Sequence, residues 1–214
     1  MCTDKLPRVT ETRGERKERT RRAILDAALR LCEDSSLVAL SLRQVAKEVG
    51  IVPTAFYRHF DSIEALGLEL VGESFISLRA MLLDVRRSDP AFEDIIDSSI
   101  GILVDHVHQQ RGHFQFIVRE RAAGPPRVRE AINTAIEQFE KELATDLVRL
   151  TGTDTWSTED LEILSALIVT AMVGLAEAVL RVPGRPDAEK AIVEGAHVQL
   201  RMVLVGALNW RSGR

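Results

Sequence analysis

Apolar residues recur every three to four positions along most of the chain, and no segment alternates for long between apolar and polar residues. The first spacing is that of an amphipathic helix, whereas strict alternation would indicate a half-buried strand. The pattern therefore predicts an all-α protein. The nine helices that we expect cover about residues 15–33, 41–49, 53–60, 61–85, 90–109, 114–122, 126–150, 157–181 and 187–210.

Residues 41–60, which read SLRQVAKEVGIVPTAFYRHF, contain two very short predicted helices that meet at a glycine. Ser41 and Gln44 have the spacing of a capping box at the start of the first helix. Gly50 suits a left-handed turn after that helix, and Pro53 suits the first position of the next. Two short helices joined by such a turn are typical of a helix-turn-helix.

Helical geometry gives this window a buried face and an outward face. Pro53, Phe56 and Phe60 lie on one side of the second helix and are expected in the core. Val45 and Ala46 of the first helix should pack against them. The outward face suits a DNA groove, because arginine can bond guanine or phosphate, and hydroxyl and imidazole groups can donate to phosphate. The predicted DNA-binding residues are Arg43, Gln44, Thr54, Ala55, Tyr57, Arg58 and His59.

Charge is unevenly distributed along the chain, whose net charge is −4. Residues 1–60 hold 12 Lys and Arg against 8 Asp and Glu, a net of +4, and the remainder holds 16 against 24, a net of −8. A basic head on an acidic body indicates a local DNA-binding module, although solvated faces of a small bundle are the alternative. A basic run before the window could follow the DNA backbone or a neighbouring minor groove. It comprises Arg13, Arg16, Lys17, Arg19, Arg21 and Arg22.

Several classes of protein are not expected from this sequence. We find no apolar run of about 18 residues, and residues 1–22 lack the apolar stretch of a secretory signal, so we expect a cytoplasmic protein without a membrane span. Cys2 and Cys32 are too few for a disulfide framework or a metal cluster. His106 and His108 point apart on their helix, so no metal site is expected. No signature of a catalytic nucleophile or phosphate loop occurs, so the chain is not expected to be an enzyme.

Residues 20–71 resemble the TetR family of bacterial transcriptional regulators, most specifically in Tyr-Arg-His-Phe at 57–60 before an acidic-capped helix. The resemblance implies a helix-turn-helix head at 1–62 and a helical effector-binding and dimerisation body at 63–214. It also implies a homodimer whose heads read the two halves of a near-palindromic, double-stranded operator. Ile63 stands where the family often has a phosphate-contacting lysine, so that contact is not assigned.

Within the family, the chain is similar to repressors of unsaturated fatty acid synthesis and desaturation that respond to acyl-CoA. The likeness rests on residues 41–60, on the lysine-free stretch FDSIEALGLELV, and on Phe114 to Arg121 with its Arg-Glu-Arg triplet. It implies a repressor in fatty acid metabolism with a long-chain acyl-CoA as effector and no cofactor. The alternatives are a TetR-like regulator of efflux or catabolic genes with another hydrophobic ligand, or a helical ligand-binding protein without DNA function.

The effector pocket is expected among the side chains of the middle helices. The chain has few aromatic residues, which favours an aliphatic, chain-shaped cavity over a flat aromatic cage. Glu177 lies within an apolar run, so it is either paired in the bundle or a polar lining residue. For the apolar candidates, ordinary core packing is the alternative. Arg119 could meet the phosphates of a CoA head, or it could form salt bridges at a solvated helix end. The predicted pocket residues are Ile102, Leu103, Phe114, Phe116, Ile117, Arg119, Phe139, Leu143, Ile168, Met172 and Glu177.

The last two predicted helices, 157–181 and 187–210, are the expected dimer face. The first is apolar nearly all round and carries small residues such as Gly174 and Ala178 that permit close packing. Two such helices from each subunit would form a four-helix interface. The alternative is that a single core buries both helices within a monomer.

Overall fold

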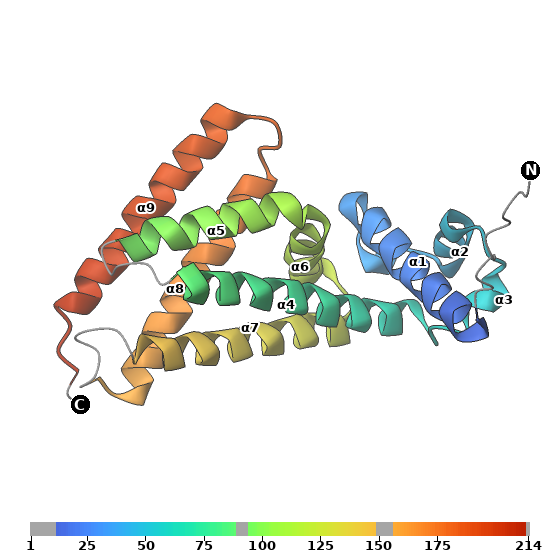
Figure 1. Ribbon diagram of the computed structural model, residues 1–214, viewed down its shortest axis with the longest axis horizontal. Helices are drawn as coiled ribbons and strands as arrows, with labels where there is room; N and C mark the ends of the chain where they lie inside the picture. Colours follow the sequence, from blue (N-terminus) through green and yellow to red (C-terminus); the bar gives the residue numbers. More distant parts are fainter. Residues whose placement is uncertain (1–11, 89–93, 149–155, 213–214) are drawn as a thin grey trace, which may run out of the picture.

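The computed structural model describes residues 12–88, 94–148 and 156–212, and every regular element within these ranges is helical (Figure 1). The predicted all-α fold is confirmed. The described part of the chain contains nine α-helices and one short 3-10 helix: α1 (Arg13–Asp34), η1 (Leu37–Ala39), α2 (Leu42–Val49), α3 (Pro53–Phe56), α4 (Ile63–Ser88), α5 (Ile95–Gln109), α6 (Arg111–Ala123), α7 (Pro126–Leu147), α8 (Thr158–Leu180) and α9 (Pro186–Leu208).

The helices α1, α2 and α3 form a head at one end of an elongated molecule, and α8 and α9 lie toward the other end (Figure 1). The long helix α4 runs from the head into the body beside α7. The shorter helix α6 packs against both α1 and α7, so it lies where the head meets the body. Helix α9 packs mainly on α8 and α5.

One hydrophobic core joins the head to the body. Phe56 and Phe60 are buried together with Leu70 of α4, Phe116 of α6 and Val128 of α7. A second core holds residues of α5, α8 and α9, and a smaller third core lies between α7 and α8. Because side chains interlock across the junction, the division into 1–62 and 63–214 stays a prediction.

The predicted capping and turn residues of the helix-turn-helix are confirmed. The Gln44 N–H donates to the Ser41 hydroxyl at 3.2 Å, and the Ser41 N–H donates to the Gln44 side chain at 2.8 Å, which completes the capping box. Gly50 has a φ of 74°, a conformation that glycine adopts without steric cost. Pro53 is the first residue of α3.

Helix α3 is shorter than predicted, because it ends at Phe56 and not at Phe60. Residues 57–59 form a turn in which the His59 N–H donates to the Phe56 carbonyl at 2.8 Å, three residues back. The core prediction for Pro53 is wrong, because this residue begins a one-turn helix at the surface and is exposed.

The start of α4 also differs from the prediction. Helix α4 begins at Ile63 and not near residue 61, and the Ser62 hydroxyl accepts the N–H of Ala65 at 3.0 Å. Ile63, which follows, is partly buried and packs against the first core. An apolar contact therefore occupies the position where a phosphate-binding lysine was considered.

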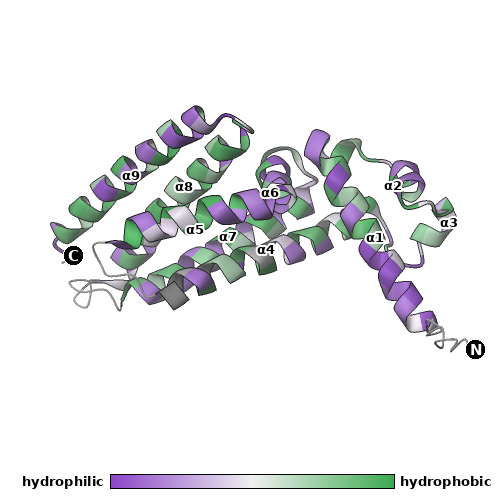
Figure 2. Cartoon of the chain, turned by 45° about the horizontal axis from the view of Figure 1, so that its top comes forward, coloured by the Kyte–Doolittle hydropathy of each residue, from purple (hydrophilic) through white to green (hydrophobic). Residues whose placement is uncertain are grey.

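Helices α8 and α9 are long and apolar enough to cross a membrane by length and composition alone, which differs from the expectation of no such run. Apolar residues lie along both helices in Figure 2. Large apolar side chains on both remain exposed in the single chain. They are Ile163, Leu167, Val198, Met202, Val205 and Leu208.

Candidate nucleic-acid interface and ligand cavity

The predicted DNA-binding residues lie on α2, on α3 and on the turn after it. Arg43, Gln44, Thr54, Tyr57 and Arg58 are exposed, and Ala55 and His59 are partly buried. The Tyr57 side chain is 60% exposed, and its ring meets Phe56 edge-on with centroids 6.1 Å apart. A buried phenylalanine thus supports an exposed tyrosine whose hydroxyl can reach a partner.

The imidazole of His59 differs from the other members of this set. Burial lowers its pKa from 6.5, and the nearby cations Lys17, Arg21 and Arg58 act in the same direction. Its Nδ1 atom is enclosed and has no hydrogen-bond partner among the described residues. His59 is therefore mainly neutral at pH 7 and adds no full positive charge to the surface.

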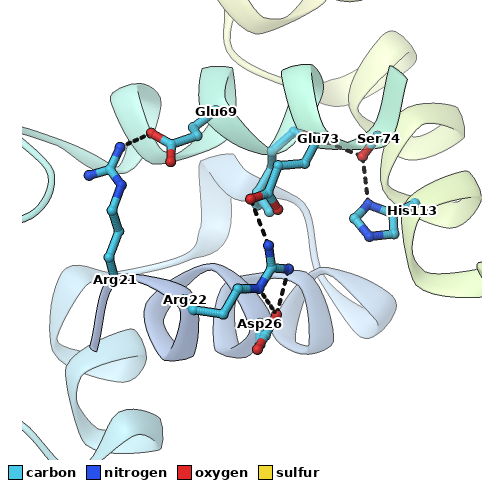
Figure 3. Close-up of polar contacts among 8 residues, drawn as sticks. Arg21, Arg22, Asp26, Glu69, Glu73, Ser74 and His113 are labelled. Atoms are coloured by element: carbon cyan, nitrogen blue, oxygen red, sulfur yellow. Dashed lines mark hydrogen bonds and ion pairs between the residues drawn. The ribbon is translucent and has the colours of Figure 1, made fainter. Parts of the chain in front are cut away.

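Two members of the basic run pair with acidic residues of α4 while keeping part of their side chains exposed, so their contact with the DNA backbone stays a prediction (Figure 3). Arg22 pairs with Asp26 at 2.7 Å and with Glu73 of α4 at 2.7 Å. Arg21 pairs with Glu69 of α4 and donates to the His59 carbonyl at 2.7 Å. The other four basic residues lie in the hydrophilic, exposed first half of α1 (Figure 2).

A buried polar contact joins α4 to α6 beside these ion pairs (Figure 3). The Ser74 hydroxyl donates to the Leu70 carbonyl at 2.7 Å and lies 2.9 Å from Nδ1 of His113. Since the hydroxyl proton is used, the proton of the second bond belongs to His113. Burial lowers the pKa of His113, which favours the neutral form of the ring. Among the described residues, no group of three potential ligands could hold a metal ion.

A cavity of about 160 Å³ lies in the body, in contact with α4, α5, α6, α7 and α8. Eight of the predicted pocket residues line it: Leu103, Phe114, Ile117, Phe139, Leu143, Ile168, Met172 and Glu177. The residues that the sequence did not single out include Phe75, Leu78, Met81, Ser99, Val118, Arg121, Ile136, Val169, Val173 and Ala176. The lining is apolar apart from Ser99, Arg121 and Glu177.

Three predicted pocket residues do not line this cavity, and each has another contact. Phe116 is fully buried in the core shared with the head. Ile102 packs against the second core. Arg119 donates to the Cys32 carbonyl at the end of α1, at 2.8 Å. The helices that carry these three residues do line the cavity, as predicted, but the residues lie on faces that point away from it.

The polar lining residues differ in whether they already have a partner. Glu177 accepts from Arg181 at 2.9 Å, so it is both paired and part of the lining. Arg121 has no ion pair or hydrogen bond among the described residues. Helical spacing could have identified it, because Arg121 follows Phe114 by seven residues and Ile117 by four.

Helix α6 contacts the cavity with one face and the head with another. Gln115 donates to the Glu33 carbonyl at 2.7 Å, and Arg119 donates to the Cys32 carbonyl at 2.8 Å. Both acceptors lie in the last turn of α1, where carbonyl groups lack helical partners. The other face of α6 carries Phe114 and Ile117 into the cavity lining.

Glu120 extends the contact between α6 and the head. Its side chain is fully buried and accepts the Leu37 N–H at 3.0 Å and the Ser36 hydroxyl at 3.2 Å. Burial raises the pKa of this carboxyl above 4.5, although the two donors act against that rise. A Cβ at Gly124 would lie 2.5 Å from the Glu120 carbonyl oxygen, so only glycine fits there without a shift.

The thiol of Cys32 lies in the same region and is buried in the first core. Burial raises its pKa to about 12, and the neighbouring charge of Glu120 adds to that effect.

Comparison with known proteins identifies both parts of the chain. Residues 24–70 match the family described as bacterial regulatory proteins, tetR family, and residues 92–202 match the tetracyclin repressor-like C-terminal domain. A transcriptional regulator from Rhodococcus sp. Rha1 is similar in structure, with 21% identity, a TM-score of 0.67, and coverage of 91% of this chain and 99% of that one. A TetR-family transcriptional regulator from Streptomyces coelicolor has 19% identity, a TM-score of 0.69, and coverage of 90% and 97%.

Replacing Glu120 by Gln is expected to change how stability depends on pH. The raised pKa means that the folded protein holds this proton more tightly than the unfolded chain does. The contribution of Glu120 to stability therefore falls as pH rises from 4.5 through the folded pKa. Urea unfolding between pH 4.5 and 7.5 should show that wild type loses stability relative to the Gln variant across this window. Parallel curves for the two proteins would contradict the expectation.

Proposed function

The chain belongs to the tetR family of bacterial regulatory proteins, and on that premise we propose that it is a repressor of lipid-metabolism genes controlled by a long-chain acyl-CoA. Its family establishes a transcriptional regulator with a helix-turn-helix DNA-binding domain and a ligand-binding domain. The repressor role, the effector and the regulated process are the proposed part. The observation that carries the proposal is that α6 has one face in an apolar cavity and the other on the head.

The exposed face of α2, α3 and residues 57–59 is the proposed reading surface. Arg58 and Tyr57 project from the turn, where they can reach base edges or phosphates in a major groove. The start of α2 adds Arg43 beside free backbone N–H groups. Two such heads about 34 Å apart, or a multiple of that distance, would read the halves of a near-palindromic operator.

Helices α8 and α9 are the proposed homodimer face. Regulators of this family are soluble DNA-binding proteins that form dimers, so we assign the apolar character of both helices to a subunit interface and not to a membrane. Ile163 and Leu167 are one helical turn apart on α8, and Val198, Met202 and Val205 have helical spacing on α9. Covering these exposed side chains would provide the apolar burial that obligate dimers use.

The effector proposal rests on the lining of the cavity. Almost all of it is aliphatic or aromatic, and Arg121 offers a cation without an internal partner. An acyl chain with an anionic head matches that combination, with the chain among the apolar residues and a phosphate or carboxylate near Arg121. Effector binding could then shift α6 and thereby the last turn of α1.

A compact hydrophobic ligand, as in a regulator of efflux or catabolic genes, is the second candidate, and the cavity volume favours it. An engineered cavity of about 150 Å³ in another protein holds a molecule as small as benzene. The present volume of 160 Å³ is similar. A long acyl chain therefore requires the cavity to widen when the effector binds.

Replacing Arg58 by Ala is expected to weaken operator binding by about 5- to 150-fold, since one base contact of this kind contributes about 1–3 kcal/mol. The operator is first selected from random duplexes by the wild-type protein, and affinities are then compared by fluorescence anisotropy at several salt concentrations. Arg185→Ala removes the same charge outside the head and should leave binding unchanged. Failure of the wild type to select any duplex would overturn the DNA-binding proposal.

Replacing Met202 by Glu is expected to convert the dimer to a monomer, because an unpaired carboxylate in an apolar interface is strongly unfavourable. Met202 is 70% exposed in the single chain, and Ile76 of α4, at 68%, provides a matched apolar control outside α8 and α9. Sedimentation velocity should show a monomer for Met202→Glu and a dimer for Ile76→Glu. A dimeric Met202→Glu protein would exclude this face.

Hexadecanoyl-CoA is expected to stabilise the wild-type protein by about 2.7 kcal/mol at a hundredfold excess over its Kd. Arg121→Gln should weaken this binding at least about tenfold through loss of a charge-assisted bond. Arg127→Gln is the control, since Arg127 is exposed and does not line the cavity. Thermal unfolding with hexadecanoyl-CoA and with neutral naphthalene distinguishes the candidates, because stabilisation by naphthalene alone would favour the compact ligand.

A further inference from the structure

The recognition turn, residues 56–60, has little internal support. Helix α3 spans four residues, and its N-cap residue Val52 makes no side-chain hydrogen bond. A helix of one turn is unstable alone, because the cost of nucleating it is offset by very few hydrogen bonds. The position of the reading side chains must therefore be set by contacts from other helices.

Arg21 of α1 makes two contacts at the end of this turn and a third with α4. Its Nη1 donates to the His59 carbonyl at 2.7 Å, and its guanidinium carbon lies 4.4 Å from the centre of the Phe60 ring. Its Nη2 pairs with Glu69 of α4 (Figure 3). The side chain is 30% exposed. One planar group thus ties the turn, α1 and α4 together.

We propose that Arg21 is a positioning residue for DNA reading, which fixes the recognition turn relative to α4, and that it is not a phosphate ligand. Nη1 of its guanidinium donates to the His59 carbonyl, and Nη2 pairs with Glu69. A phosphate contact would have to compete with an ion pair that is already formed. The inference rests on the proposed reading role of Tyr57 and Arg58, which flank the anchored carbonyl in sequence.

The neighbouring pair provides a matched comparison. Arg22 and Glu73 form a second ion pair between α1 and α4, one residue along α1 and one turn along α4. Neither makes a hydrogen bond or ion pair to residues 56–60 in the described contacts. Removing Arg22 therefore removes the same charge as removing Arg21, and removing Glu73 the same charge as removing Glu69. Each change breaks one ion pair between α1 and α4 without releasing the recognition turn.

The sign of the effect at Glu69 separates positioning from simple electrostatics. Removing a carboxylate beside a DNA-binding head should strengthen binding to the DNA polyanion if only charge matters. If Glu69 holds Arg21 against the turn, removing it should weaken binding to the operator. The two roles thus predict opposite changes for the same variant.

The test uses the full-length protein and a duplex that the wild type selects from a random pool. Arg21→Met should lower operator affinity about tenfold or more, as expected for loss of a charged hydrogen bond. The slope of log affinity against log salt should stay unchanged, and the preference for the operator over an unrelated duplex should fall. Arg22→Met should lower the affinity less and keep the preference.

Glu69→Met should weaken operator binding, whereas Glu73→Met should not. The double variant Arg21→Met/Glu69→Met should bind about as weakly as the worse single variant, because both changes release one anchor. Circular dichroism and thermal unfolding check that each variant is folded. If Arg21→Met does not fold, Glu69→Met alone tests the proposal.

Three results would overturn the inference. In the first, the slope of log affinity against log salt falls in magnitude by about 0.9 per head in Arg21→Met, and affinity falls equally for the operator and the unrelated duplex. That result indicates a phosphate contact. Another is tighter operator binding by Glu69→Met, and the third is additive effects in the double variant. If the wild type selects no duplex at all, the proposed DNA-binding function fails instead.

Discussion

A helix of one turn cannot hold its shape in water, and the proposed reading surface of this regulator is built on such a helix. The core beneath it therefore decides where its exposed side chains lie. Phe56 and Phe60 occupy that core together with Leu70 of α4 and Phe116 of α6. Because protein interiors are close-packed, a displacement of α4 or α6 must be accommodated by the residues under the reading surface.

Helix α6 adds polar links to this apolar junction. Gln115 and Arg119 bond carbonyl groups in the last turn of α1, and Glu120 bonds the N–H of Leu37. A hydrogen bond has a narrow range of distance and direction, whereas apolar contacts tolerate sliding. The polar links thus fix the register between α6 and the head, while the shared core supplies most of the burial.

Local signals in the sequence were sufficient for much of this structure. The capping box of Ser41 and Gln44, the glycine after α2 and the period of the apolar residues depend on neighbours along the chain, and these predictions are confirmed. Contacts between distant segments were not accessible in this way. Arg21 was grouped with surface cations because its partner Glu69 lies 48 residues away.

The cavity shows the same division between what was and was not predictable. Periodicity identified the helices that line it and eight of its residues. It could not assign Phe116 to the core of the head. Which face of α6 meets each neighbour depends on how α6 packs against α1 and α7, and periodicity does not give that packing. Tyr57 and Arg58 were placed on the surface correctly, since both the predicted helix and the observed turn leave them outside.

The buried thiol of Cys32 has a consequence for the chemical environments in which the head can work. With a pKa of about 12, the Cys32 thiol is almost entirely protonated at pH 7 and carries very little of the reactive thiolate. Peroxides and electrophiles attack that form, and the closed core also denies them access. Cys32 is therefore protected in the folded head, and its alkylation rate would report how often the junction between head and body opens.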